Sequence, residues 1–383
     1  MCCTQLCVGF VHWFVMLHSD QCAGRGDRSF SSITLISCLL RLRGTYFLLL
    51  HPQILHVQLH VYDIYGLNGK QFYQFKFPDD CQIFMGSSGT WLVFIDNIGR
   101  KLRVWNPFSL IHIALPFDEA SKNYNKVIVS CTGPLIKNGE DVVFGVLYDS
   151  NHLACIRLSD KKWVVVETDS IPRLSTVINH FVFPKEKIND LIFYKGKLYF
   201  LNNSGMVYVC EENVHAPRDY DHHYCHPMKA LKLSDPIDIT ERQFMIKSND
   251  AHIRRYYLVE VGGELMLVVQ LSISGTCLED DFRVFKLDFN EAKWKFVQKK
   301  DLNDWSLFLS DNFHASMAAR AASETSHIYF KISTEDDSQS ELQNYKVVVC
   351  DYLAFNKPRI IFSEVTKLHC HFIDPTWIIP RHT

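Results

Sequence analysis

The feature of this sequence that most limits its fold is a series of short apolar blocks separated by turn residues. From about residue 56 onward, these blocks are rich in Val, Ile, Phe and Tyr, and they lack the 3.6-residue spacing of an amphipathic helix. Such blocks are typical of β-strands. The clearest pair spans 255–261 and 264–270, joined by Gly262 and Gly263 as a two-residue hairpin turn. The chain is therefore predicted to be all-β.

The strand blocks group into modules that repeat along the chain. The first strands of successive modules begin near residues 91, 142, 190, 256 and 326, and 59–77 supplies one more strand pair. Modules of about 40 to 50 residues, lengthened by insertions, are the sequence pattern of a β-propeller. We therefore predict a single β-propeller of six or seven blades over residues 56–383, with the two chain ends sharing the closing blade. The alternative is a pair of β-sandwich domains, but no linker rich in Pro, Gly or Ser divides the chain.

Composition narrows the classes of partner. The 383 residues include 40 Lys and Arg against 42 Asp and Glu, so the net charge of −2 predicts no binding to nucleic acid or to an anionic membrane surface. No transmembrane helix is predicted, because the apolar N-terminal stretches are too short or contain arginines. The 13 cysteines are odd in number, which favours reduced thiols and a cytoplasmic or nuclear location. The alternative is a secretory signal peptide at 6–17, which lacks a preceding basic segment.

A run of residues within 78–116 has a characteristic order. It contains a Gly-Ser-rich turn, a Trp-Leu strand and an Asn-Pro pair, formed by Gly86, Ser87, Ser88, Gly89, Trp91, Leu92, Asn106 and Pro107. This order resembles that of the plant F-box-associated, kelch-like proteins with a KIB-type β-propeller domain. The resemblance extends over about residues 60–380, and it implies that these eight residues are structural signature positions of the propeller.

The resemblance also implies a non-catalytic, protein-binding function. Members of this family recognise substrates for ubiquitin ligases or restrain a GSK3-like kinase through the propeller. Their N-terminal F-box, which binds a Skp-type adaptor, opens with Leu-Pro, and no such opening is found in residues 1–55. These residues are left as an unassigned, poorly defined N-terminal segment. The expected partner is therefore a GSK3-like kinase or a ligase substrate rather than a Skp-type adaptor.

One His-rich segment has the residue types of a zinc site. His215, His222, His223, Cys225 and His226 lie within 12 residues, but their spacing matches no zinc motif, and 214–227 is polar like a loop. A second polar segment, 333–344, is also predicted to be a loop. No metal or other cofactor is expected. The sequence has no phosphate-binding loop or nucleophile elbow, so no catalytic residue is assigned and the chain is predicted not to be an enzyme.

Aromatic residues have two predicted roles. Trp305 and Phe308, at a predicted junction of loop and strand, are candidates for contact with a partner. The tryptophans at 91, 105, 163 and 294 fall on predicted strands at corresponding blade positions, and we expect them in blade cores. The alternative function is an enzyme or small-molecule binder that uses the propeller channel, which requires His, Asp or Glu side chains from several blades to converge.

Overall fold

The structure is a computed structural model that describes most of the predicted strands. The described residues are 48–52, 61–65, 71–76, 83–96, 101–106, 109, 111–116, 124–130, 142–148, 152–159, 163–167, 187–212, 228–237, 252–272, 281–302, 305–309, 316–320, 327–334, 342–351, 359–367 and 376–378. Among them, the regular elements are β-strands apart from one 3-10 helix, Lys299–Leu302. No helix in these ranges is long and apolar enough to span a membrane. The all-β prediction is confirmed.

The first sheet combines strands from both ends of the chain. β25 (Thr376–Ile378) pairs antiparallel with β1 (Leu48–Pro52), and β2 (Val61–Tyr65) and β3 (Gln71–Lys76) complete the sheet. This pairing confirms that the two chain ends share one sheet. Because β1 lies within the unassigned segment 1–55, the strands of the propeller begin before residue 56.

The next sheet is a simple antiparallel meander, and the sheet after it has two halves. The meander contains β4 (Ile83–Ser88), β5 (Trp91–Ile95), β6 (Leu102–Trp105) and β7 (His112–Ala114). The eight-stranded sheet contains β8 (Tyr124–Val129), β9 (Val143–Tyr148), β10 (His152–Arg157), β11 (Val164–Glu167), β12 (Ile188–Tyr194), β13 (Lys197–Asn202), β14 (Val207–Glu212) and β15 (Met228–Lys232). Its two antiparallel halves join where β11 runs parallel to β15, with Val166 opposite Met228. The sequence modules do not predict this joint.

The last two sheets lie in the C-terminal half of the chain. One is a meander of β16 (His252–Val261), β17 (Glu264–Ser272), β18 (Asp281–Asp288) and β19 (Lys293–Phe296). The other contains β20 (Trp305–Phe308), β21 (Met317–Arg320), β22 (His327–Thr334), β23 (Leu342–Asp351) and β24 (Arg359–Lys367). Its order is β21-β20-β22-β23-β24, with β20 parallel to β22, so this sheet departs from the predicted meander.

The predicted loop at 333–344 is shorter than expected. β22 continues through Thr334 and β23 begins at Leu342, so both ends of the polar segment are strand. Thr334 lies opposite Asn344 in the antiparallel register. Ladder hydrogen bonds are made by the backbone, and they continue through polar residues as readily as through apolar ones. Polarity of the side chains was therefore a poor guide to where these strands end.

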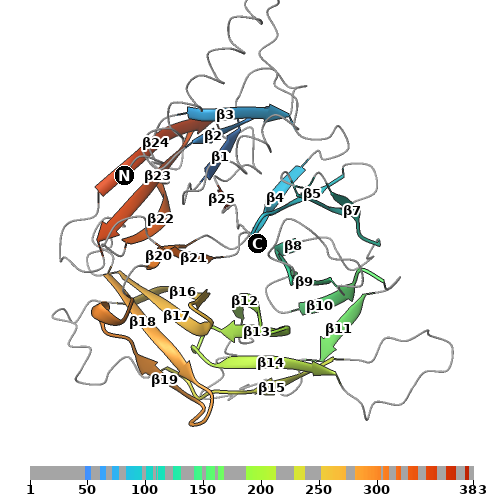
Figure 1. Cartoon of the computed structure of the whole chain (residues 1–383), viewed down its shortest axis with the longest axis vertical. Coiled ribbons are helices and arrows are strands. Elements are labelled where there is room, and N and C mark those ends of the chain that lie inside the picture. Colours follow the sequence, from blue (N-terminus) through green and yellow to red (C-terminus); the bar gives the residue numbers. More distant parts are fainter. Residues whose placement is uncertain are drawn as a thin grey trace, which may run out of the picture.

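The sheets are arranged around a central axis, as Figure 1 shows. Contacts between neighbouring sheets run from β25 to β4, then to β8, β12, β16 and β21, and these strands lie nearest the centre of the view. One strand from each unit thus faces the axis, which is the arrangement of a β-propeller. The fold class is confirmed, and the number of six or seven blades stays a prediction.

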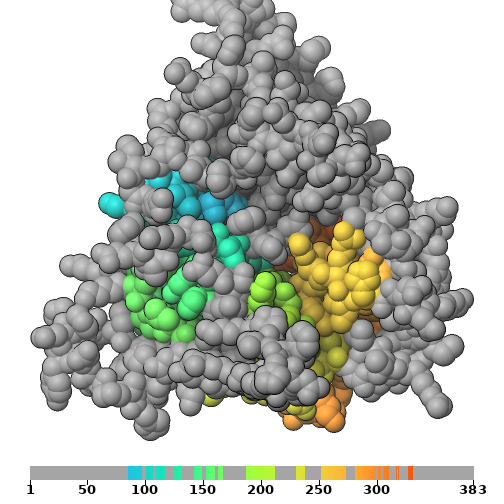
Figure 2. Space-filling view, turned by 180° about the vertical axis from the view of Figure 1, so that it is seen from behind, coloured from blue at the N-terminus to red at the C-terminus, as the bar shows by residue number. Residues whose placement is uncertain are grey.

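The hydrophobic core lies between the sheets. Four apolar clusters fill successive spaces, and the residues of one cluster come from two neighbouring sheets or half-sheets. Residues 265–272 of β17 are all buried, because both faces of this strand are covered. Such strands have nearly continuous apolar runs rather than alternation. In the view from behind, residues of 187–211 (yellow-green) lie beside residues of 252–272 (yellow) (Figure 2).

Candidate interaction site

The Gly-Ser signature segment connects two neighbouring sheets. Gly86 and Ser87 lie in β4, next to a register shift, and the turn to β5 is formed by Gly89, whose φ is +62°, and Thr90. The hydroxyl of Ser88 accepts a hydrogen bond from the backbone N–H of Val129 in β8, with an N–O distance of 3.0 Å. The signature serine is therefore a buried link between the inner strands of two sheets.

Asn106 fixes the same end of this sheet, where the β4–β5 turn lies. Its Nδ2 donates to the Thr90 hydroxyl at 2.8 Å, and its Oδ1 accepts from the backbone N–H of Ser109 at 3.1 Å. Asn106 and Thr90 are both completely buried, so these hydrogen bonds compensate for the loss of water. Trp91 and Leu92 are completely buried as well. Pro107, the last signature residue, lies outside the described residues.

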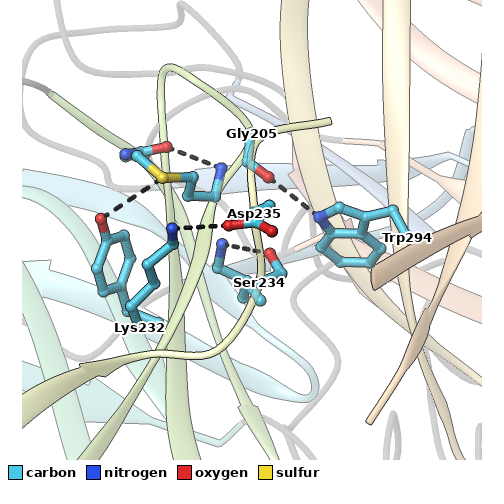
Figure 3. A network of polar contacts seen from close by, with 9 residues as sticks. Gly205, Lys232, Ser234, Asp235 and Trp294 are labelled. Atoms are coloured by element: carbon cyan, nitrogen blue, oxygen red, sulfur yellow. Dashed lines mark hydrogen bonds and ion pairs between the residues drawn. The ribbon is translucent and has the colours of Figure 1, made fainter. Parts of the chain in front are cut away.

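The four predicted core tryptophans occupy two kinds of position. Trp91 and Trp105 are buried core residues in the second and third strands of their sheet. Trp163, which directly precedes β11, and Trp294, in β19, are partly buried. The indole N–H of Trp163 donates to the carbonyl of Pro116 and that of Trp294 to the carbonyl of Gly205, both at 3.0 Å. Figure 3 shows Trp294 reaching Gly205. The expectation of one shared blade position is therefore wrong, because Trp91 and Trp105 lie in different strands of one sheet.

A buried ion pair joins three inner strands. Lys126 of β8 and Asp190 of β12 form an ion pair, although only 3% and 2% of their surfaces are exposed. The other carboxylate oxygen of Asp190 accepts from the backbone N–H of Leu258 in β16 at 2.7 Å. The sequence analysis did not identify this pair, because its members are 64 positions apart and each sits in an ordinary strand block.

An aromatic cluster lies where three sheets meet, and we call it the aromatic seam. It consists of Tyr194, Lys195, Tyr199, Phe289 and Trp305, together with the Gly262-Gly263 turn. The phenol of Tyr194 donates to the carbonyl of Gly263 at 2.7 Å, which ties the β12–β13 hairpin to the β16–β17 hairpin. A Cβ atom placed on Gly262 would lie 3.5 Å from the Trp305 ring, so this turn also touches β20.

Phe289 is the most exposed aromatic member of the seam. Its ring stacks on Tyr194, with 5.8 Å between centroids, and meets Tyr199 edge-on at 6.2 Å. Both tyrosines are buried, yet 38% of Phe289 remains exposed. The turn that holds it is fixed by Asp288, whose Oδ1 accepts from the backbone N–H groups of Asn290 and Glu291. Phe289 is therefore an apolar side chain presented on an ordered turn.

The predicted contact residues Trp305 and Phe308 differ in exposure. Trp305 begins β20, is partly buried and packs beside the Gly262-Gly263 turn. Phe308 is completely buried and stacks on Tyr329 at 4.7 Å, because β20 lies inside its sheet with β21 on one side and β22 on the other. Of the two, only Trp305 retains exposed surface, and its contact with a partner stays a prediction.

The remaining candidate groups do not form an open site among the described residues. The His-rich segment with His215, His222, His223, Cys225 and His226, where no metal was expected, falls between β14 and β15 and lies outside those residues. Within them, no group of three or more His, Cys, Asp or Glu side chains could hold a metal ion. Cys155 and Cys210 are buried free thiols, and burial raises the pKa of Cys155 to about 12. Both are therefore protonated at neutral pH.

These features define the class of the protein. Sheets packed around an axis through apolar faces describe a β-propeller. The family model described as KIB1-4 beta-propeller matches residues 62–352. The chain belongs to this KIB1-4 β-propeller family, which confirms the resemblance seen in the sequence. No curated protein sequence matches the chain.

Several solved structures are similar to this chain at low identity. The N-terminal domain of Nup159 is 10% identical, with 87% of this chain and 76% of that chain covered and a TM-score of 0.32. Hsv2 of Kluyvelomyces marxianus is 11% identical, with 65% and 71% covered and a TM-score of 0.31. The Cps50 (Swd1) β-propeller domain of Myceliophteria thermophila is 8% identical, with 85% and 87% covered and a TM-score of 0.32.

Proposed function

We propose that this chain is a non-catalytic protein-binding propeller and that the aromatic seam is part of its binding surface. The observation that carries the proposal is Phe289, which is 38% exposed although it stacks on the buried ring of Tyr194. An aromatic side chain presented on a fixed turn loses little conformational entropy when a partner covers it. Truncation of a hot-spot side chain at the centre of an interface costs about 2 kcal/mol or more of binding free energy.

The resemblance to F-box-associated proteins suggests the class of partner. We propose a GSK3-like kinase that the propeller restrains, or a substrate that it presents to a ubiquitin ligase, with a location in the cytoplasm or nucleus. The buried, protonated thiols of Cys155 and Cys210 are compatible with a reducing compartment. Neither partner requires a catalytic group in the propeller.

The test compares truncations of two apolar side chains of equal exposure. Phe289→Ala removes the exposed ring, whereas Leu231→Ala removes a side chain of equal exposure, 39%, on β15. We expect the purified chain to bind a purified GSK3-like kinase and lower its activity on a peptide substrate. Phe289→Ala should weaken binding by about tenfold or more, and Leu231→Ala should leave it unchanged. Equal binding by both variants would remove the seam from the interface.

A parallel measurement addresses the ubiquitin-ligase partner. A Skp-type adaptor is offered to the full chain and to a chain that lacks residues 1–47, which keeps β1 in place. We expect neither form to bind the adaptor. Binding by the full chain alone would show that residues 1–47 contain an adaptor-binding module despite the missing Leu-Pro opening. Failure to bind the kinase would contradict the kinase as the partner, whereas failure to bind the adaptor is the expected result.

A further inference from the structure

Two strained turns meet at the aromatic seam. Among the described residues, the non-glycine residues with positive φ are Lys195, at +48°, and Ala292, at +54°. Lys195 lies in the β12–β13 turn, and Ala292 closes the β18–β19 turn that presents Phe289. A left-handed conformation costs an ordinary side chain about 1 kcal/mol, and glycine or asparagine avoids this cost. A lysine at this position of a two-residue hairpin is therefore contrary to the local preference.

Four acidic side chains near the seam are already in ion pairs. Glu211 is paired with Lys197 at 2.7 Å, and Glu264 with Lys286 at 2.9 Å. Asp288 and Glu291 are both paired with one ammonium group, at 2.6 and 2.7 Å, that of Lys295.

Lys195 has no ion pair with any described residue. Its Nζ instead lies 4.9 Å from the centroid of the Tyr194 ring, and the side chain is exposed. The largest interaction of this ammonium group is a side-chain hydrogen bond with Tyr194. Glu264 is the acidic group that acts on it electrostatically, but that carboxylate is already paired with Lys286. The ammonium group of Lys195 is thus held by an aromatic ring in an open position, where it can receive an anionic group.

The Lys195 ammonium and the Phe289 ring both contact Tyr194. Tyr194 stacks on Phe289 and also lies below the ammonium group of Lys195. The two groups are therefore separated by no more than about three residues of extended chain, at roughly 3.3 Å per residue. A segment with one apolar and one anionic side chain can contact both at once.

We propose that Phe289 and Lys195 together bind a protein segment in which a carboxylate lies close to a large apolar side chain. This inference rests on the proposed protein-binding function and specifies the chemistry of the partner. The apolar side chain packs on Phe289, and the carboxylate accepts hydrogen bonds from the Lys195 ammonium. One unpaired cation matches one carboxylate, whereas a polyanion such as a nucleic acid requires a row of them.

The experiment uses random peptides, so that it does not depend on a known partner. Twelve-residue peptides displayed on phage are selected on the full chain and counter-selected on Phe289→Ala. We expect the selected peptides to share an Asp or Glu within three residues of Leu, Ile, Met or an aromatic residue. The proposal would be overturned if the selected peptides lacked this pair of residues, or if no peptide bound the full chain better than the Phe289→Ala variant.

Two substitutions at Lys195 separate binding from folding. Lys195→Asn retains a residue suited to the left-handed turn, so the melting temperature should be unchanged or higher, while affinity for the selected peptide falls about tenfold. Lys195→Arg retains the positive charge and should bind as the unchanged chain does. Equal affinity of the Asn and unchanged proteins would overturn the role of the ammonium. Leu231→Ala serves as the control and should bind fully.

The outcomes of the two proposals are distinguishable. If a GSK3-like kinase binds but Lys195→Asn binds it equally well, the proposed function stands and the inference about carboxylates fails. If no kinase binds while acidic, apolar peptides are selected in a manner that depends on Lys195 and Phe289, the inference stands and the kinase is the wrong partner.

Discussion

At the scale of single residues, the Lys126–Asp190 pair illustrates what a buried charge can do in a propeller. Both side chains are almost completely buried, and Asp190 also accepts hydrogen bonds from the backbone N–H groups of Leu191 and Leu258. The pair thereby links β8, β12 and β16, three strands that face the axis. Removing one charge leaves the other without compensation in a poorly solvated site, at a cost of about 3 to 5 kcal/mol.

A double-mutant cycle tests this link. Asp190→Asn keeps an acceptor for the Leu258 N–H but leaves the Lys126 ammonium without its anion. Lys126→Met leaves the Asp190 carboxylate without its cation. We expect each single variant to lose about 3 kcal/mol or more of unfolding free energy, measured by urea denaturation. The double variant should lose clearly less than the sum of the two, with a coupling of about 1 to 3 kcal/mol.

The same cycle on an exposed pair provides the control. Lys232 and Asp235 form an ion pair at 2.8 Å, but their side chains are 43% and 73% exposed (Figure 3). Water screens such a pair, so the coupling in the Lys232→Met and Asp235→Asn cycle should stay below about 1 kcal/mol. Equal couplings in the two cycles would show that burial gives the Lys126 pair no special role.

Residue-scale features were the hardest to predict from the sequence. The hydroxyl of Ser88 and the amide of Asn106 were singled out by their order in a signature run, which gave no partner for either. Their partners, Val129 and Thr90, lie 41 and 16 positions away. Lys126 gave no signal at all, because a lysine in a strand block usually points to solvent. Contacts between distant side chains depend on register and blade order, which composition and spacing leave open.

At the scale of elements, the β13–β14 turn packs closely against Ile237. Gly205 has a φ of +76°, and a Cβ atom there would lie 2.5 Å from Cγ2 of Ile237. Asn202 closes the turn by accepting from the backbone N–H groups of Ser204 and Met206. The carbonyl of Gly205 accepts from Trp294 of the next sheet, so this turn also positions a neighbour (Figure 3).

Two glycine substitutions separate strain from crowding. Gly196→Ala has the same φ of +76° but nothing within 4 Å of the new Cβ, so it should cost about 1 kcal/mol of unfolding free energy. Gly205→Ala adds the clash with Ile237, and should cost about 1 to 3 kcal/mol more. Thermal unfolding of both variants gives the comparison. If the two variants have the same melting temperature, Ile237 moves aside without cost and the joint is looser than described.

Elements were predicted well where the pattern was local and poorly where it was not. The predicted hairpin at Gly262-Gly263 is confirmed as β16–β17. The parallel joint between β11 and β15 was missed, because 60 residues separate the paired strands and neither contains a pairing signal. The placement of β20 between β21 and β22 was also missed, because none of these strands contains a pairing signal.

At the scale of the whole molecule, closure of the ring depends on a short C-terminal strand. β25 pairs with β1 through Leu48, Leu49 and Leu50, and it also contacts β4 of the following sheet. It is therefore the strand of the first sheet that faces the axis. Without it, β1 has an unpaired edge and the contact that joins this sheet to β4 is lost.

Two C-terminal truncations test the closure. A chain that ends at residue 375 lacks β25, whereas a chain that ends at residue 378 keeps it and loses only the residues beyond. Because ring contacts are cooperative, we expect the shorter chain to unfold over a broader range of urea and to be cleaved faster by protease around 48–76. The longer chain should match the full chain in both measurements. If the shorter chain unfolds as sharply and at the same urea concentration as the longer one, then β25 does not close the ring, and β1–β3 must be held by their contacts with neighbouring sheets alone.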